Sequence, residues 1–172
     1  PLRQALIDAA ADHSATVGLA ASMGLRADTS TILVFGGSQG ARFLNTMMAC
    51  VVPRLAAHRD AVQVIHLTGS VDNEALIRAY AEAGIPARVQ CADAEIQACY
   101  RLADLVICRA GASSICELAL FGKPAILIPL PTAAEDHQTA NARLLATRGA
   151  AVHLAQDETT AALVTETVLG WL

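Results

Sequence analysis

Two short segments of the sequence combine glycine and serine with the start of an apparent helix, a combination that suits phosphate binding. They are GGSQGAR at 36–42 and CRAGASSICE at 108–117. Glycine lets a backbone turn tightly and approach a ligand closely, and the free N–H groups at a helix N-terminus attract anions. The first segment matches neither the GxGxxG spacing of dinucleotide-binding loops nor the GK[ST] ending of a P-loop. Taken alone, it is explained equally well as a plain strand-to-helix turn.

The second segment also carries a carboxylate, Glu117, about one turn inside the predicted helix. A carboxylate accepts several hydrogen bonds, and the two hydroxyls of a ribose are matching donors. However, Ser114 and Glu117 also fit a capping box, in which the glutamate only stabilises the start of the helix, and Ser113 or Ser114 is the expected cap. Both roles for Glu117 stay open on this local pattern.

A third polar group follows the proline-rich segment 129–131 and lies at the start of another predicted helix, for which Asp136 is the expected N-cap. His137, Gln138 and Asn141 are spaced i, i+1 and i+4, so they cluster at one end of that helix. Such neutral hydrogen-bonding groups suit sugar hydroxyls. A single histidine like His137 is nevertheless more often a surface residue than a catalyst.

The elements that must position these groups alternate between short apolar runs and longer helical segments. Strands are predicted at 31–35, 63–67, 87–90, 105–108, 125–128 and 151–154, and one helix is predicted from residue 2 to about residue 23. With right-handed crossovers, six such strands form a doubly wound parallel sheet of the α/β class. Ligands of these sheets bind beyond the carboxyl ends of the strands, where all three polar segments fall.

Composition narrows the class of protein further. The 172 residues are 54% hydrophobic but only 3% aromatic, which indicates one domain, 1–172, with a core of Ala, Leu, Ile and Val. A net charge of −4 without a Lys/Arg cluster gives no reason to expect a nucleic-acid partner. Five cysteines without a CxxC pair indicate reduced, buried thiols in the cytosol rather than disulfides. We expect neither a metal site nor a cofactor, and no transmembrane segment is apparent.

In this order and at these spacings, GGSQGAR (36–42), CRAGASSICELALFGKPAILIPLP (108–131) and EDHQTANA (135–142) resemble the carboxyl-terminal domain of the MurG family. That family transfers N-acetylglucosamine from UDP-N-acetylglucosamine to lipid I, forming lipid II for peptidoglycan. The resemblance covers nearly the whole chain. It implies a Rossmann-like half of a two-domain GT-B glycosyltransferase, with the amino-terminal acceptor domain lying outside this chain.

The resemblance also implies which residues bind the donor. The expected ligands of the diphosphate are Gly37, Ser38, Gln39, Gly40, Gly111, Ala112 and Ser113. Glu117 is expected to bind the ribose hydroxyls. His137 and Gln138 are expected to face the sugar, and Asn141 belongs with them to the substrate-binding set. Arg3 matches an arginine near the nucleotide, because Pro1-Leu2-Arg3 looks like the end of the family's GNPxR segment.

The uracil is expected to lie against the segment 91–96, where the sequence departs from the family pattern. Asp93 stands where an aliphatic residue is expected. A uracil read by backbone groups would tolerate this change. The resemblance implies no catalytic residue in this chain, because it places the probable general base and the lipid-binding surface on the amino-terminal domain. It also implies contact with the cytoplasmic face of the membrane through the full-length protein only.

Two other functions remain open at this point. The chain could be a separate donor-binding subunit, similar to the eukaryotic split N-acetylglucosaminyltransferase that works with a membrane-bound partner. It could also be a non-transferase relative that uses the same sheet to bind a UDP-sugar. The combination of Glu117 with His137 and Gln138 favours a transferase over this last alternative.

Overall fold

The computed structural model describes residues 2–12, 14–37, 42–69, 74–92 and 94–171. Its elements are, in order, α1 (Gln4–Ala11), α2 (Val17–Ser22), β1 (Ser30–Phe35), α3 (Arg42–Leu55), η1 (Ala56–His58), β2 (Val62–Leu67), α4 (Glu74–Ala83), β3 (Ala87–Gln90), α5 (Ile96–Leu102), β4 (Leu105–Cys108), α6 (Ala112–Phe121), β5 (Ala125–Leu127), η2 (Ala134–Asp136), α7 (His137–Ala146), β6 (Ala151–His153) and α8 (Ala161–Leu169). Helices and strands alternate along the chain, as predicted.

The six strands form a single parallel sheet in the order β3-β2-β1-β4-β5-β6. This confirms the predicted doubly wound sheet, and every strand lies within one residue of its predicted bounds. The register places the last residues of the strands level with one another, since Phe35 pairs with both Leu67 and Cys108, and Cys108 pairs with Leu127. The loops that leave the strands therefore start from one common edge.

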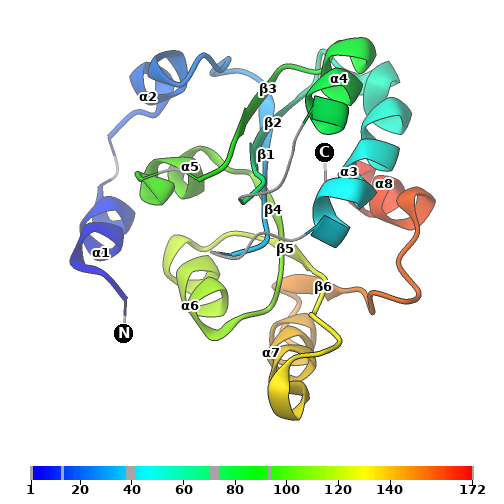
Figure 1. The fold of residues 1–172 in the computed structure, drawn as a ribbon. Coiled ribbons are helices and arrows are strands. Elements are labelled where there is room, and N and C mark those ends of the chain that lie inside the picture. The colour runs from blue at the N-terminus through cyan, green and yellow to red at the C-terminus, as the bar shows by residue number, and fades with distance from the viewer. Residues whose placement is uncertain (1, 13, 38–41, 70–73, 93, 172) are drawn as a thin grey trace.

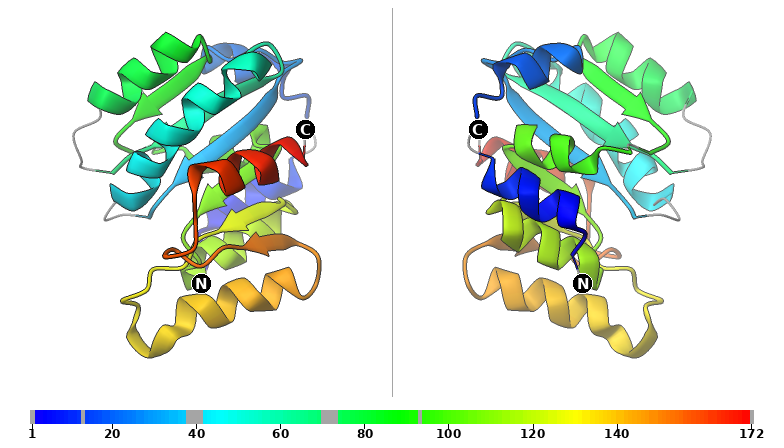
Figure 2. Two further views of the ribbon diagram at one scale, coloured as in Figure 1. Left: turned by 90° about the vertical axis from the view of Figure 1, so that its right-hand side faces the viewer. Right: turned by 90° about the vertical axis from the view of Figure 1, so that its left-hand side faces the viewer.

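Helices cover both faces of the sheet, as Figures 1 and 2 show. Along β1, Ile32 and Val34 belong to the core beneath α3, α4 and α8, whereas Leu33 and Phe35 belong to the core beneath α1, α5 and α6. A strand that is buried on both faces needs apolar residues at every position, which explains the unbroken run Ile-Leu-Val-Phe. Both cores contain mainly aliphatic side chains.

The prediction of one helix from residue 2 to about residue 23 is wrong. The structure has two shorter helices, α1 and α2, with a break after Ala11. Asp12 explains the break, because its carboxylate accepts a hydrogen bond from the Ser14 amide (2.9 Å) and forms an ion pair with Arg101 of α5 (2.6 Å). Local side-chain bonds of this kind compete with the helical backbone bond.

A fully buried polar network joins β2 to the two helices above it. Asn45 of α3 donates its amide N–H to the Thr68 carbonyl (3.0 Å), so its oxygen faces Nε2 of His66 (3.1 Å). Nε2 must then carry the proton, and Nδ1 accepts from the Tyr80 hydroxyl of α4 (3.0 Å). Burial lowers the pKa of His66 to about 3, which keeps the ring neutral. The sequence alone gave His66 no role.

The cysteines differ from the prediction in one respect. All five are free in the structure, and only Cys99 and Cys108 are buried. Cys50, Cys91 and Cys116 are exposed, so the prediction of buried thiols is wrong for these three. Cys50 lies on α3, Cys116 lies on α6 beside a cavity that it shares with Leu2 and Arg3, and Cys91 directly follows β3.

Candidate functional site

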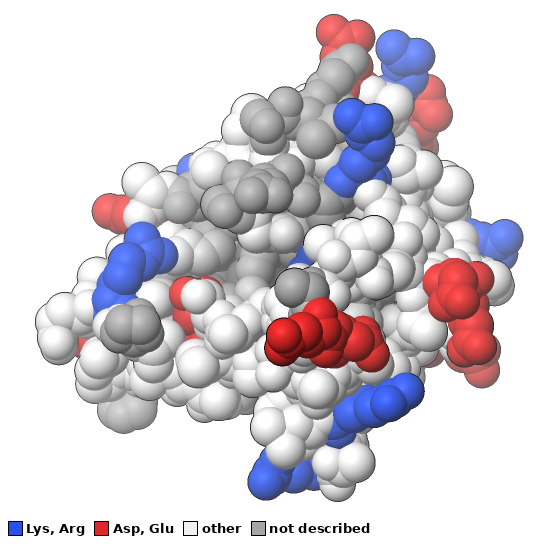
Figure 3. All heavy atoms as spheres, turned by 60° about the horizontal axis from the view of Figure 1, so that its bottom comes forward, with Lys and Arg blue, Asp and Glu red and all other residues white. Residues whose placement is uncertain are grey.

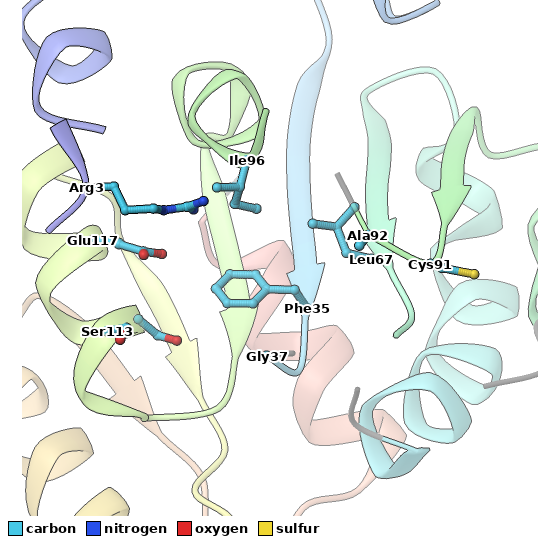
Figure 4. Close-up of a pocket in the computed structure, with 10 residues that line it drawn as sticks. Arg3, Phe35, Gly37, Leu67, Cys91, Ala92, Ile96, Ser113 and Glu117 are labelled. Atoms are coloured by element: carbon cyan, nitrogen blue, oxygen red, sulfur yellow. The ribbon is translucent and has the colours of Figure 1, made fainter. Parts of the chain in front are cut away.

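The neighbouring strands β1 and β4 mark the point where the strand order reverses. The chain leaves β1 towards α3 on one face of the sheet and leaves β4 towards α6 on the other, so the two loops diverge. A crevice between diverging loops is the usual ligand site of doubly wound sheets. Here a cavity of about 400 Å³ opens at this place, lined by Arg3, Phe35, Gly37, Leu67, Cys91, Ala92, Ile96, Ser113, Ser114 and Glu117. Figure 4 shows how these groups surround it.

Gly37, at the end of β1, brings the backbone to this cavity. Its φ of +89° lies in the region that side chains disfavour, and a Cβ built there meets no atom within 4 Å. Glycine is therefore required by the backbone conformation rather than by lack of space. Helix α3 begins at Arg42, five residues later. The predicted diphosphate ligands Ser38, Gln39 and Gly40 lie outside the described residues.

The amino-terminal end of α6 forms the opposite wall. Gly111 occupies the N-cap position without a side-chain hydrogen bond, and the helix begins at Ala112. The prediction that Ser113 or Ser114 caps this helix is therefore wrong. Both serines instead lie in its first turn and line the cavity. The first intrahelical backbone bond runs from the Ile115 amide to the Gly111 carbonyl (3.0 Å), and the amides before it have no acceptor within the helix.

Glu117 lies one turn further along α6, half-buried at the cavity wall. Its Oε2 accepts a hydrogen bond from the hydroxyl of Tyr100 on α5 (2.9 Å). Because Ser114 is not the N-cap, the capping-box geometry does not apply to Glu117. The sequence analysis did not identify Tyr100, since no pattern indicated that α5 would pack against α6.

Arg3 reaches the same cavity from the other end of the sequence. It precedes α1, and its carbonyl accepts the Leu6 amide (3.0 Å). Leu6 is buried in the core shared with α5 and α6, which fixes the beginning of the chain beside Glu117. Figure 4 shows the Arg3 and Glu117 side chains entering the cavity from two separate elements. A second cavity of about 620 Å³ adjoins it, lined by Leu2, Arg3, Leu6, Ala112, Ser113, Cys116 and Glu117.

The segment predicted to hold the uracil forms a third part of the wall. Cys91, Ala92 and Ile96 line the cavity, opposite α6 and next to Phe35. Asp93 lies outside the described residues. The structure thus brings the described part of the 91–96 segment to the same cavity as Glu117, although twenty or more residues separate them in the sequence.

The α7 residues do not line either of these two cavities. Gln138 accepts the Leu130 amide (3.0 Å), and Asn141 donates to the Ala110 carbonyl (3.0 Å) in the β4–α6 loop. Asp136 occupies the predicted N-cap position, but it has a left-handed φ of +51° and its side chain makes no capping bond. Gln138 and Asn141 therefore stabilise, through these two hydrogen bonds, the loops that border the site. His137 lies exposed beside them.

Arg109 was not assigned a role from the sequence, yet it holds several of these loops together. Its buried guanidinium donates to the carbonyls of Ile128 (3.0 Å) and Pro129 (2.9 Å) and to the Gln156 side chain (2.6 Å). It also lies 5.5 Å from the centre of the Phe43 ring in the first turn of α3. Burial lowers its pKa, although an arginine remains charged. The sequence pattern that could have identified Arg109 is a charged residue directly after an apolar strand.

Charge is spread thinly over the surface around the site. Figure 3, in which the bottom of Figure 1 is turned forward, shows Lys and Arg side chains scattered among mostly uncharged atoms. Within the described ranges, no group of three or more His, Cys, Asp or Glu residues is placed to hold a metal ion. None of the helices in the described part of the chain is long and apolar enough to cross a membrane.

A doubly wound sheet with a crevice lined by glycine backbone, a helix N-terminus and a carboxylate defines an α/β domain of the class that binds ligands at the carboxyl edge of its strands. Comparison with known proteins specifies its class. Residues 31–171 match the family model of the glycosyltransferase family 28 C-terminal domain. The chain belongs to this family of glycosyltransferase domains.

Its relatives include UDP-N-acetylglucosamine--N-acetylmuramyl-(pentapeptide) pyrophosphoryl-undecaprenol N-acetylglucosamine transferases. The protein of that name from Syntrophotalea carbinolica is 46% identical over 145 residues, which cover 81% of this chain and 40% of the relative. That from Nitratidesulfovibrio vulgaris is 49% identical over 128 residues, covering 74% and 34%. The chain thus spans well under half the length of these relatives.

A solved structure agrees with these relatives. The crystal structure of Acinetobacter baumannii MurG superposes with a TM-score of 0.75 at 32% identity, covering 88% of this chain and 44% of that chain. The predicted fold class, a Rossmann-like half of a GT-B glycosyltransferase, is confirmed. The resemblance to MurG on which that prediction rested is confirmed as well.

Proposed function

We propose that this chain is the donor-binding domain of an inverting N-acetylglucosaminyltransferase that uses UDP-N-acetylglucosamine. The observation that carries the proposal is the cavity at the carboxyl edge of β1 and β4, where a glycine turn, a helix N-terminus and Glu117 converge. Relatives at 46% and 49% identity bear the name of such a transferase. By the same reasoning, residues 1–172 form one donor-binding domain and the acceptor domain lies elsewhere in the protein.

In this proposal Glu117 binds the ribose. Its Oε2 already accepts one hydrogen bond from Tyr100, which leaves Oε1 and a further lone pair of Oε2 directed at the cavity. The two ribose hydroxyls are donors at a separation that a carboxylate can match. The uracil then lies towards Cys91, Ala92 and Ile96, whose backbone offers donors and acceptors that do not depend on the side chain at position 93.

The diphosphate binds between the two diverging loops. The backbone of Gly37 and the first amides of α6, from Ala112 to Ser113, face the cavity from opposite sides, and Arg3 supplies a positive charge at its rim. Peptide dipoles at a helix N-terminus favour negative charge. Ser38, Gln39, Gly40 and Gly111 complete this set in the proposal.

These groups also favour the chemical step. The bond between the anomeric carbon and the diphosphate oxygen breaks, UDP leaves as an anion, and the acceptor hydroxyl attacks from the opposite face, which inverts the anomeric centre. Amides fixed in advance at the phosphates stabilise the charge that develops on the leaving group. The proton of the acceptor hydroxyl passes to a base on the other domain, so this chain contributes no catalytic base. Alone, it is expected to bind donor without turnover.

The sugar is expected to lie towards α7, where His137 and Gln138 are presented at the helix start and Asn141 holds Ala110 in place. Lipid I is the proposed acceptor, and it contacts the other domain at the cytoplasmic face of the membrane. This places the full-length protein in lipid II formation for peptidoglycan, with consequences for cell shape and division. Nucleic acid has no part in this proposal.

Isothermal titration with UDP-N-acetylglucosamine, UDP-glucose and GDP-mannose tests the proposal. We expect the first ligand to bind most tightly, the second more weakly because it lacks the N-acetyl group, and the third least because guanine replaces uracil. Glu117→Gln serves as the site variant and Glu82→Gln, on the exposed face of α4, as its matched control. Equal affinity for all three ligands, or an equal effect of both variants, would contradict the assignment.

A further inference from the structure

The Tyr100 hydroxyl is the group that holds the Glu117 carboxylate in the cavity. Tyr100 lies on α5 and Glu117 on α6, and the 2.9 Å hydrogen bond between them is the described contact that fixes the direction of the carboxylate. Glu117 is only half-buried, so without such a partner its side chain could adopt other rotamers towards solvent. A carboxylate that must accept two hydroxyls at once loses affinity when it is free to rotate.

The tyrosine ring is itself immobilised. It is fully buried and lies between two other aromatic rings. Phe121, at the end of α6, stacks on it at 5.1 Å between centroids and 10° between planes, and Phe35, at the end of β1, meets it edge-on at 5.9 Å. The hydroxyl position is therefore set by three elements, β1, α5 and α6, all of which contribute residues to the cavity.

The direction of the hydrogen bond is also fixed. Burial raises the pKa of Tyr100, and the nearby Cys108 and Glu117 raise it further, so the phenol stays protonated and acts as the donor. The carboxylate consequently keeps its remaining lone pairs for other donors. Leaving a buried hydroxyl without an acceptor is costly, which favours the orientation in which Glu117 accepts from Tyr100.

We infer that Tyr100 is a positioning residue for ribose recognition: it orients Glu117 towards the 2′- and 3′-hydroxyls of the bound nucleotide without touching the nucleotide itself. This inference rests on the proposed function, in which Glu117 binds the ribose. It goes beyond that function because it assigns part of the affinity to a buried residue behind the cavity wall.

The test compares UDP with 2′,3′-dideoxy-UDP, which lacks both ribose hydroxyls, by isothermal titration of the whole chain. The measured quantity is the Kd of dideoxy-UDP divided by the Kd of UDP. Tyr100→Phe removes the hydroxyl and keeps the stacked ring. We expect this variant to bind UDP about three- to tenfold more weakly and to bind dideoxy-UDP with unchanged affinity. An unfolded fraction would lower the stoichiometry and leave the ratio of Kd values intact.

Tyr80→Phe is the matched control. Tyr80 is the other tyrosine of the chain, is equally buried, and also donates its hydroxyl within the core, but to His66 beneath α4. We expect this variant to lose stability and to keep the wild-type ratio. In the double variant Tyr100→Phe/Glu117→Gln, the ratio should fall no further than in Glu117→Gln alone, because the hydroxyl acts only through the carboxylate.

Three results would overturn the inference. Tyr100→Phe could lose the same affinity for both ligands, it could keep the wild-type ratio of Kd values, or the two substitutions could have additive effects on that ratio in the double variant. If Glu117→Gln lowers the ratio while Tyr100→Phe does not, only the inference fails and the ribose assignment stands. If the wild type binds both ligands equally, the ribose assignment and the inference fail together.

Tyrosine absorption gives a measurement that does not depend on the folding of Tyr100→Phe. A hydroxyl that donates to a carboxylate absorbs at longer wavelength than one that donates to a neutral amide. The difference spectrum of wild type minus Glu117→Gln should therefore show a red-shifted tyrosine band. The same difference should persist in the Tyr80→Phe background, and its absence would refute the contact.

Discussion

The buried histidine of β2 makes the stability of this domain depend on pH in a way that can be calculated. His66 is neutral in the folded protein with a pKa of about 3, whereas the pKa of a histidine in the unfolded chain is close to the ordinary value of 6.5. Between these values the unfolded state binds one more proton than the folded state. Stability from this group is therefore fully present above pH 6.5 and is lost as the pH falls towards 3, by about 1.4 kcal/mol per pH unit.

At pH 5.0 this corresponds to a loss of about 2 kcal/mol relative to pH 7.5, since 1.5 pH units separate 6.5 from 5.0. Urea unfolding followed by circular dichroism at both pH values measures it. His66→Leu should be less stable at pH 7.5 by about 2–5 kcal/mol, because the Tyr80 hydroxyl and the Asn45 oxygen lose their partner. The variant should also lose most of the pH dependence, so the two stability curves converge on acidification.

His58→Gln provides the control, because His58 is exposed and lies outside the network. It should keep the wild-type dependence on pH. If His66→Leu retained the full 2 kcal/mol loss between pH 7.5 and 5.0, the dependence would come from other groups and the account of a neutral, buried His66 would be refuted.

Three further substitutions test separate parts of the structure. Glu117→Ala is expected to weaken UDP binding by about 1–3 kcal/mol in calorimetry through loss of the ribose contact, and unchanged affinity would reduce Glu117 to a structural residue. Arg109→Met removes the side chain that donates hydrogen bonds to two buried carbonyls and to Gln156. The free energy of unfolding in urea should therefore fall by about 1–3 kcal/mol. An unaltered value would show that the loops do not depend on this residue. Gly122→Ala places a side chain at φ +60° at the end of α6 with no atom within 4 Å of the added Cβ, so thermal unfolding should report a loss of about 1 kcal/mol from backbone strain, with UDP binding unchanged.

The sequence by itself determined the strands and their order of alternation with helices. The run Ile32-Leu33-Val34-Phe35 is apolar at every position because both faces of β1 are covered. This pattern can be recognised from the sequence alone. The glycine at position 37 and the polar residues after β4 were likewise predicted to lie at the edge where ligands bind. They do so because the carboxyl ends of parallel strands share one edge.

Only the tertiary structure decided which residues face one another across that edge. Tyr100 and Glu117 lie on different helices, and no periodicity within either helix predicts that their side chains meet. The same holds for His66 with Asn45 and Tyr80, and for Asp12, whose bonds to Ser14 and Arg101 divide the predicted first helix. Local patterns record burial and backbone preference, whereas the partner of a polar side chain depends on how distant elements pack.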